Sequence, residues 1–148
     1  MPDPKPNQID LEALSWTYSQ KTGELLQNGE HVAMGYSGAA DGKNNPEMQD
    51  VPNVGPIPQG DWAIDGPPVD TRDHGPYVLR LEPGPATETH GRSGFLMHGD
   101  SKIHPGTASH GCIILPRAVR EHVWQSGDRD LEVVAELPSD DGGQNQPK

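Results

Sequence analysis

Glycine and proline constrain the fold of this chain more than any other feature. The 148 residues include 18 glycines and 16 prolines, and these stand between short apolar runs along the whole chain. Glycine and proline are unfavourable inside helices and mark turns. Short apolar runs bounded by turn residues are typical of a small β domain, and the length suits a single core.

Apolar and polar residues alternate in several of these runs, as they do in half-buried strands. The alternation is clear at residues 14–19, 77–82 and 131–137. Asn28-Gly29 predicts a two-residue hairpin turn, because both residues accept the positive φ angles of such turns.

Further strands are expected at residues 60–65 and at GFLMHG, where a buried strand would end at His98. The stretches 37–59, 66–76 and 83–93 are rich in turn residues and are expected to be connections. A loop as long as 37–59 in a compact domain is often functional, so it is a candidate lid.

One helix is predicted, beginning at Pro116. Proline suits a helix start, Val119 and Val123 lie four residues apart on one face, and Gly127 can end the helix. The chain is therefore expected to be mostly β, either a sandwich or a partly closed barrel, with one short helix.

The domain is predicted to span residues 11–137. Residues 1–10 and 138–148 contain almost no apolar side chains, so both are expected to be flexible or disordered tails.

The charge balance argues against two classes of partner. The chain has 11 basic and 22 acidic residues, a formal net charge of −11. Nucleic acids and anionic membrane surfaces both attract basic proteins. No apolar run is long enough for a membrane helix, and the start lacks the pattern of a secretory signal, so no membrane insertion is expected and any export would need another route.

The sole cysteine, Cys112, stands in the stretch TASHGCIILP. Cysteine catalysis needs a thiolate, a base, and donors for the oxyanion of the tetrahedral intermediate. Gly111 allows a sharp turn and close substrate approach, so the N–H groups of Gly111 and Cys112 are candidate oxyanion donors.

Two histidines are candidates to assist the thiol. His98 ends an apolar strand upstream, and a loop and return from there would bring it to Cys112. His110 lies two residues before Cys112, so an extended segment would put both side chains on one face.

Two alternatives remain open at this point. A lone cysteine can be an inert buried residue. His98, His104, His110 and Cys112 could instead form a zinc site, although neither CxxC nor HExxH spacing is present. A papain-like arrangement fits poorly, because its histidine lies far downstream of the cysteine.

The sequences FLMHGD and SHGCIIL resemble the active-site signature of YkuD-type L,D-transpeptidases. More narrowly, LSWTYSQKTGEL, GYSG, GKNNPEMQDVPNVGPIPQG, GPYVLRLEP, GRSGFLMHGD and ASHGCIILPRAVRE resemble the L,D-transpeptidase effectors delivered by type VI secretion. Together these stretches cover residues 14–135, nearly the whole chain.

The resemblance implies a role for each residue of the signature. Cys112 would be the nucleophile and His98 the general base, while Ser109, His110 and Gly111 would shape the catalytic turn. Arg92, Gly99 and Asp100 are further candidates for substrate binding, Arg92 through a stem-peptide carboxylate. No metal or other cofactor is implied.

The implied activity is removal or exchange of the terminal D-Ala of peptidoglycan tetrapeptide stems, through a thioester acyl-enzyme. The implied setting is an antibacterial effector that is made without a signal peptide, secreted by the type VI apparatus and active in the target-cell periplasm. A cognate periplasmic immunity protein would then be expected. The alternatives are a housekeeping cell-wall L,D-transpeptidase and a catalytically silent peptidoglycan-binding module.

Thiol reactivity separates the active enzyme from the silent module. An activated Cys112 would react with alkylating agents well below the pH that an ordinary thiol requires, and removal of His98 would abolish the difference.

Overall fold

The computed structural model describes residues 16–137. The predicted tails 1–10 and 138–148, and the first residues of the predicted first strand, lie outside the described residues.

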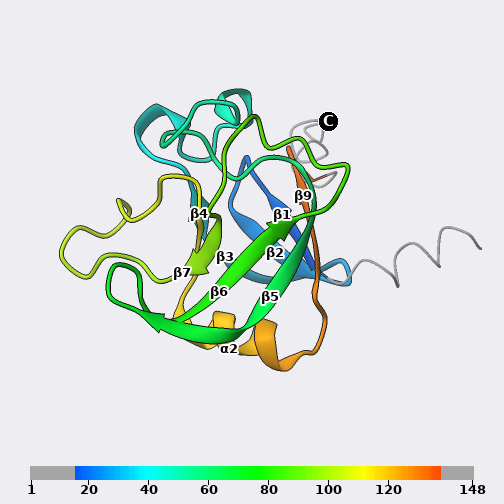
Figure 1. Cartoon of the computed structure of the whole chain (residues 1–148), viewed down its shortest axis with the longest axis vertical. Coiled ribbons are helices and arrows are strands. Elements are labelled where there is room, and N and C mark those ends of the chain that lie inside the picture. The colour runs from blue at the N-terminus through cyan, green and yellow to red at the C-terminus, as the bar shows by residue number, and fades with distance from the viewer. Residues whose placement is uncertain (1–15, 138–148) are drawn as a thin grey trace, which may run out of the picture.

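Within residues 16–137, nine strands form one mixed sheet in the order β3-β2-β1-β9-β5-β6-β7-β8-β4 (Figure 1). Two short 3-10 turns and one α-helix complete the fold. The elements are β1 (Trp16–Ser19), β2 (Glu24–Gln27), β3 (Glu30–Met34), β4 (Tyr36–Ser37), η1 (Ala40–Gly42), η2 (Pro46–Met48), β5 (Gly60–Thr71), β6 (Gly75–Pro83), β7 (Leu96–His98), β8 (Ile113–Ile114), α2 (Arg117–Gln125) and β9 (Asp130–Val134).

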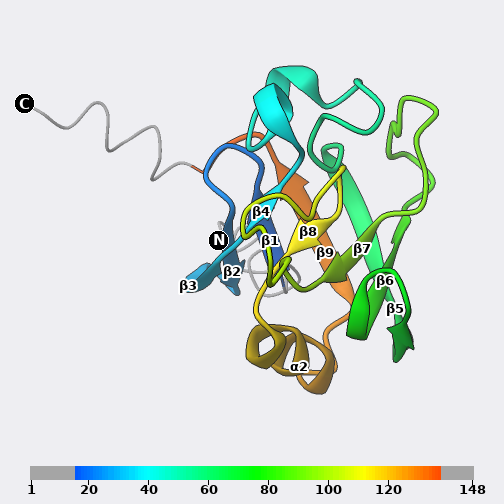
Figure 2. The ribbon, with the colours of Figure 1, turned by 90° about the vertical axis from the view of Figure 1, so that its left-hand side faces the viewer.

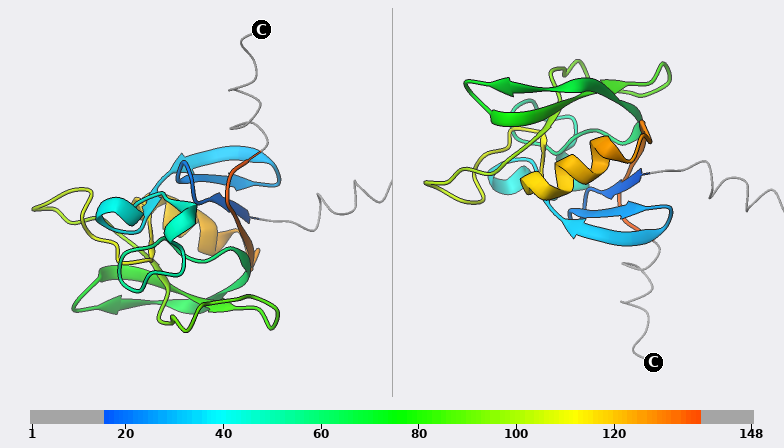
Figure 3. Two further views of the ribbon diagram at one scale, coloured as in Figure 1. Left: turned by 90° about the horizontal axis from the view of Figure 1, so that it is seen from above. Right: turned by 90° about the horizontal axis from the view of Figure 1, so that it is seen from below.

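The sheet curls back toward itself. Its edge strands β3 and β4 are separated in the chain by Gly35 alone, so the edges of the sheet must lie close together. The views along the vertical axis show the β2–β3 and β5–β6 hairpins on opposite sides of the molecule (Figure 3). The mostly β prediction is confirmed, and the arrangement is one curled sheet in place of the two sheets of a sandwich.

The core fills the inside of this curl with the apolar residues that alternate along the strands. Trp62 and Phe95 meet there edge to face, with ring centroids 5.2 Å apart. The largest fully buried apolar side chains are Trp16, Tyr18, Leu25, Ile57, Leu79, Met97, Ile113, Leu115, Leu131, Val78 and Val123.

The predicted helix is confirmed as α2, which lies between the two hairpins (Figure 3). Pro116 is its N-cap, and Gly127, at φ +82°, follows its end. Arg120 is buried on the inner face, where its guanidinium donates to the carbonyls of Pro76, Tyr77 and Leu115 at 3.0, 2.9 and 2.5 Å. These bonds join the helix to β6 and to the end of β8.

The expected connection at 66–76 is wrong. β5 and β6 continue through most of it as a long hairpin with Thr71 paired to Gly75. The register shifts between Asp65 and Val69, and proline is tolerated where the ladder is interrupted in this way. Gly66 has no room for a side chain, because an added Cβ would overlap the Trp124 ring.

The expected connection at 37–59 is a folded loop that packs over β4 and β8 (Figure 2). It contains η1 and η2. At its base, the buried Ser37 hydroxyl donates to the Gly111 carbonyl and accepts from the Ile57 N–H, both at 2.9 Å. The loop is therefore bonded directly to the turn that carries Cys112.

Candidate active site

The parallel pair of β7 and β8 places His98 and Cys112 on the same face of the sheet. The register pairs Met97 with Ile113 and His98 with Ile114. One residue earlier, Cys112 lies beside Leu96. Side chains two residues apart on a strand share a face, so Cys112 and His98 are diagonal neighbours.

The hydrogen bonding of His98 fixes which ring nitrogen is basic. Nδ1 lies 2.9 Å from the carbonyl of Gly99, which can only accept, so Nδ1 carries the proton. Nε2 is therefore the unprotonated nitrogen. It is buried and has no hydrogen-bond partner among the described residues. A buried, unpartnered acceptor is costly, and such exceptions mark functional groups.

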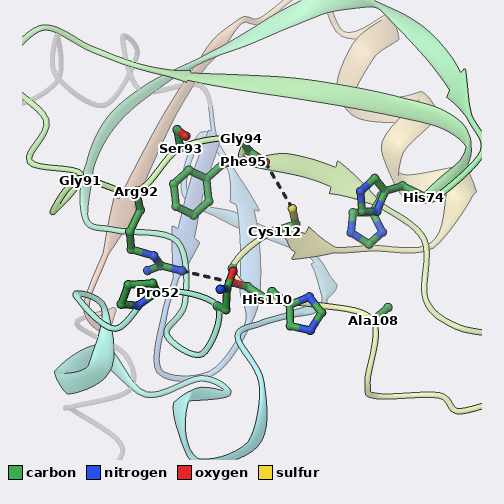
Figure 4. Close-up of a pocket in the computed structure, with 13 residues that line it drawn as sticks. Pro52, His74, Gly91, Arg92, Ser93, Gly94, Phe95, Ala108, His110 and Cys112 are labelled. Atoms are coloured by element: carbon green, nitrogen blue, oxygen red, sulfur yellow. Dashed lines mark hydrogen bonds between the residues drawn. The ribbon is translucent and has the colours of Figure 1, made fainter.

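The thiol of Cys112 is half-buried and points toward the Gly94 carbonyl, 3.9 Å from Sγ (Figure 4). Burial raises the pKa of this thiol, while the Leu96 N–H and the positive charge of Arg92 act in the opposite direction without cancelling the rise. Burial also lowers the pKa of His98. Both shifts favour the uncharged forms of the pair, the thiol and the neutral imidazole.

Ser109 organises the turn before the cysteine from inside the protein. Its buried hydroxyl donates to the Cys112 carbonyl at 2.6 Å and accepts from the N–H groups of Gly38 and Gly111 at 2.9 and 3.0 Å. The Gly111 N–H is thus engaged within the turn. Of the two expected oxyanion donors, the Cys112 N–H stays the candidate, since no hydrogen bond outside the strands and helices of residues 16–137 uses it.

Gly111 is required by its backbone and by its surroundings. Its φ is +140°, and an added Cβ would lie 2.5 Å from a guanidinium nitrogen of Arg92 and 3.0 Å from the Phe95 ring. The segment therefore turns at this residue. The extended conformation that would put His110 beside Cys112 is not present, and the His110 side chain is exposed.

Arg92 is 8% exposed, and its guanidinium bonds backbone carbonyls. Nη1 donates to Gln49 and Pro56 at 2.6 and 2.9 Å, and Nη2 donates to Gly55 and His110 at 2.9 and 3.2 Å. These bonds clamp the loop 37–59 to the catalytic turn. The donors expected to meet a substrate carboxylate are thus occupied by protein carbonyls.

Asp100 and Gly99 also have structural partners. The Asp100 carboxylate accepts from the Tyr36 hydroxyl at 2.5 Å and from the N–H groups of Ser101 and Gly106 at 2.8 and 3.0 Å, which shapes the loop 100–107. Burial raises the pKa of Asp100, but these hydrogen bonds outweigh it and the pKa is lowered. Gly99 lies against the Arg120 guanidinium, where an added Cβ would come within 3.1 Å.

Two cavities meet at His98. The smaller, of about 250 Å³, contains the thiol, and the larger, of about 780 Å³, lies toward α2. His74, His98, Ala108 and His110 line both. No acidic residue lines the smaller cavity in the described part of the chain, although the protein is acidic overall. The other residues of the smaller cavity are Pro52, Asn53, Gly91, Arg92, Ser93, Gly94, Phe95, Gly111 and Cys112.

His74 is not among the site residues predicted from the sequence. It lies in the tip of the β5–β6 hairpin and reaches the cavity on the side of Cys112 away from Arg92 (Figure 4). Its ring centroid is 4.5 Å from that of His98. The misassigned connection at 66–76 concealed it, because only a long hairpin carries His74 as far as β7.

The zinc alternative is not supported by the positions of its ligands. Within residues 16–137, no three or more His, Cys, Asp or Glu side chains converge to hold a metal ion, so His98, His104, His110 and Cys112 do not form a cluster.

The described helix is too short and too polar to cross a membrane.

In a comparison with protein families, the model of the Tlde1 domain matches residues 31–135. No curated protein matches the sequence. The matched range contains both His98 and Cys112, the loop 37–59 and the β5–β6 hairpin.

Proposed function

Because the chain belongs to the Tlde1 domain family, a family of type VI secretion L,D-transpeptidase effectors, we propose that it is a cysteine L,D-carboxypeptidase and L,D-transpeptidase acting on peptidoglycan tetrapeptide stems. The observation that supports the chemistry best is the buried, unpartnered Nε2 of His98. It shares a sheet face and a cavity with the thiol of Cys112.

In the acylation step, Sγ of Cys112 attacks the carbonyl carbon between diaminopimelate and the terminal D-Ala, while Nε2 of His98 accepts the thiol proton. The Cys112 N–H donates to the resulting oxyanion. Collapse of the tetrahedral intermediate breaks the C–N bond, and the His98 imidazolium returns its proton to the departing amine. The products are free D-Ala and a thioester on Cys112.

In the deacylation step, His98 removes a proton from the second nucleophile, which attacks the thioester carbonyl and releases the thiol. Water gives the tripeptide, a D-amino acid gives an exchanged stem, and an amine of another stem gives a crosslink. The larger cavity at His98 has room for such a nucleophile. Its lining includes Lys102 and Arg117, which can attract a ligand carboxylate, together with Asp73 and the hydrogen-bonded Asp100.

The pKa directions bear on the kind of base catalysis. Burial raises the pKa of Cys112 and lowers that of His98, and both shifts favour transfer of the thiol proton to His98 during the attack over a thiolate formed beforehand. A fixed Nδ1–H tautomer is essential to this mechanism, since Nε2 must accept the proton. The bond from Nδ1 to the Gly99 carbonyl supplies it.

The reaction is tested with purified disaccharide-tetrapeptide, with and without D-methionine, followed by mass spectrometry. We expect the wild-type protein to produce tripeptide, or the D-Met stem when D-methionine is present. Cys112→Ala and His98→Ala should produce neither. His31→Ala is the matched control, because His31 pairs with Glu24 on the β2–β3 hairpin and lines neither cavity, and this variant should retain full activity.

The outcome also separates the alternatives. A wild-type protein that binds the tetrapeptide and leaves it unchanged under both conditions would be a silent binding module. Product formation that persists in Cys112→Ala would refute the assignment of Cys112 as the nucleophile.

The effector role is tested in cells. Production in the periplasm of a susceptible bacterium should stop growth with Cys112 present and leave Cys112→Ala harmless, and a cognate periplasmic immunity protein should restore growth. Secretion should cease in a producer that lacks the type VI sheath. Secretion that continues there would favour a housekeeping enzyme exported by another route.

A further inference from the structure

His74 has a side chain that its own turn does not use. Its backbone N–H donates to the Thr71 hydroxyl at 2.8 Å, and Thr71 pairs with Gly75, so the turn is held by groups other than the imidazole. The ring instead lies against His98, with centroids 4.5 Å apart and planes inclined by 39°.

We propose that His74 is a positioning residue for His98. The His74 imidazole packs against the His98 ring and holds Nε2 of His98 toward the thiol of Cys112. This inference rests on the proposed function, because it requires His98 to be the base. Its physical basis is that a single hydrogen bond fixes only one point of a ring. The bond from Nδ1 to Gly99 still allows the His98 ring to rotate about that contact, and the adjacent His74 ring limits this rotation.

Groups from several elements surround His98. Arg120 of α2 and Asp100 of the loop after β7 act on its charge, and Cys112 of the turn before β8 lines the same cavity. The β5–β6 hairpin contributes His74. His110 lines the same two cavities and makes no ring contact with His98 in the described structure.

His74 also affects the pKa of His98 through its charge. Burial is the largest cause of the lowered pKa of His98; the charges of His74 and Arg120 lower it further, while the Gly99 carbonyl and Asp100 raise it. A protonated His74 therefore opposes protonation of the base. The other titratable groups that line the cavities around His98 are Asp73, Arg92, Lys102, His110, Cys112 and Arg117.

Two substitutions separate the roles of the ring and its charge. His74→Ala removes both, whereas His74→Phe keeps an aromatic ring of similar reach. Arg72→Ala is the matched control, since it removes a cation from the same exposed turn at a residue that lines neither cavity. Circular dichroism and thermal unfolding establish that each variant is folded.

The kinetic readout is kcat and KM on tetrapeptide as a function of pH. We expect kcat of His74→Ala to fall about tenfold with KM little changed, because orientation of the base is lost. His74→Phe should stay within about threefold of the wild type. In both variants the acid-side midpoint of kcat/KM should move to higher pH, because a charge that lowered the pKa of His98 is gone. Arg72→Ala should match the wild type in all three respects.

A readout that needs no turnover comes from nitrogen NMR of the His98 ring. The wild-type spectrum should show protonated Nδ1 and free Nε2. Both variants should keep this tautomer, because the Gly99 carbonyl sets it, and both should show a higher pKa of His98. His74→Ala alone should also broaden the His98 ring signals, because its ring has lost the contact that limits its motion.

The two measurements separate failure of this inference from failure of the proposed function. A wild-type protein without turnover, combined with these NMR changes, would overturn the proposed reaction and leave only the packing of His74 on the His98 ring. An active wild type whose His98 ring signals, His98 pKa and kcat are all unchanged in His74→Ala would overturn the positioning role alone.

Discussion

Replacement of Arg92 by Met tests whether this residue is a clamp for the catalytic turn or a ligand for substrate. The substitution keeps most of the side-chain volume and removes the charge and all the N–H donors. In the structure these donors bond the carbonyls of Gln49, Gly55, Pro56 and His110. Met offers none of them a partner.

The magnitude follows from the two carbonyls whose bonds to Arg92 are fully buried, those of Gly55 and Pro56. A buried polar group left without its partner costs about 1.5 to 2.5 kcal/mol, so the pair costs about 3 to 5 kcal/mol. The other two carbonyls border solvent and are omitted, because water can replace the guanidinium there. At roughly 4 °C per kcal/mol for a domain of this size, Tm should fall by about 12 to 20 °C.

The assay is thermal and urea unfolding of Arg92→Met and Arg92→Lys beside the control Arg80→Met. Lys keeps the charge and lacks the planar fork, so it should recover about half of the loss. Arg80 is half-exposed, with a 3.7 Å ion pair to Asp65 and a 3.5 Å contact to the Gly66 carbonyl, and its replacement should cost at most about 1 kcal/mol.

A second readout is the reactivity of Cys112. Because the charge of Arg92 lowers the pKa of this thiol, Arg92→Met should raise it further, and Arg92→Lys should preserve most of the effect. Equal stability of Arg92→Met and Arg80→Met would refute the clamp. An increase in KM without loss of stability would instead restore the substrate-carboxylate role that the sequence suggested.

The remaining predictions concern the turn and the loop beside it. Ser109→Ala should cost about 2 to 4 kcal/mol in urea unfolding, because two N–H groups and one carbonyl lose the buried hydroxyl, and Ser109→Thr should recover most of that loss. Gly111→Ala should reduce kcat at least about a hundredfold, since its Cβ would overlap Arg92 and Phe95, whereas Gly29→Ala, also at positive φ but with open space around it, should leave kcat unchanged. The lowered pKa of Asp100 means that its contribution to stability is complete above the pKa of the unfolded chain and is lost as pH falls through the folded value. Wild type and Asp100→Asn should therefore differ in Tm at pH 7 and converge in acid, and a difference that grows in acid would contradict the hydrogen bonding assigned to this carboxylate.

Local patterns predicted those parts of the fold that depend on neighbouring residues. Asn28-Gly29 forms the β2–β3 turn with φ angles of +51° and +86°, and GFLMHG contains a strand that ends at His98. The helix begins after Pro116 as expected. Each of these follows from backbone preference and periodicity over a few residues, which the sequence displays directly.

The same local reasoning failed where a sheet overrides a turn signal. Residues 66–71 read as a connection because of Gly66 and the prolines after it, yet they continue β5 through an irregular register. Propensity is weak against the pairing that a long partner strand offers. The error removed His74 from consideration, since its place in the site depends on the reach of that hairpin.

By itself, the sequence determined the mostly β class, the single helix, and the candidate pair of Cys112 and His98, because turn residues, periodicity and a motif are all local. Only the tertiary structure decided that Arg92 clamps a loop, that Ser109 occupies the Gly111 N–H, and that His74 packs on His98. Each of these depends on which backbone carbonyl, N–H or ring comes within a few ångströms from a distant part of the chain. That proximity is set by how the sheet curls and where its strands pair, and no local pattern encodes it.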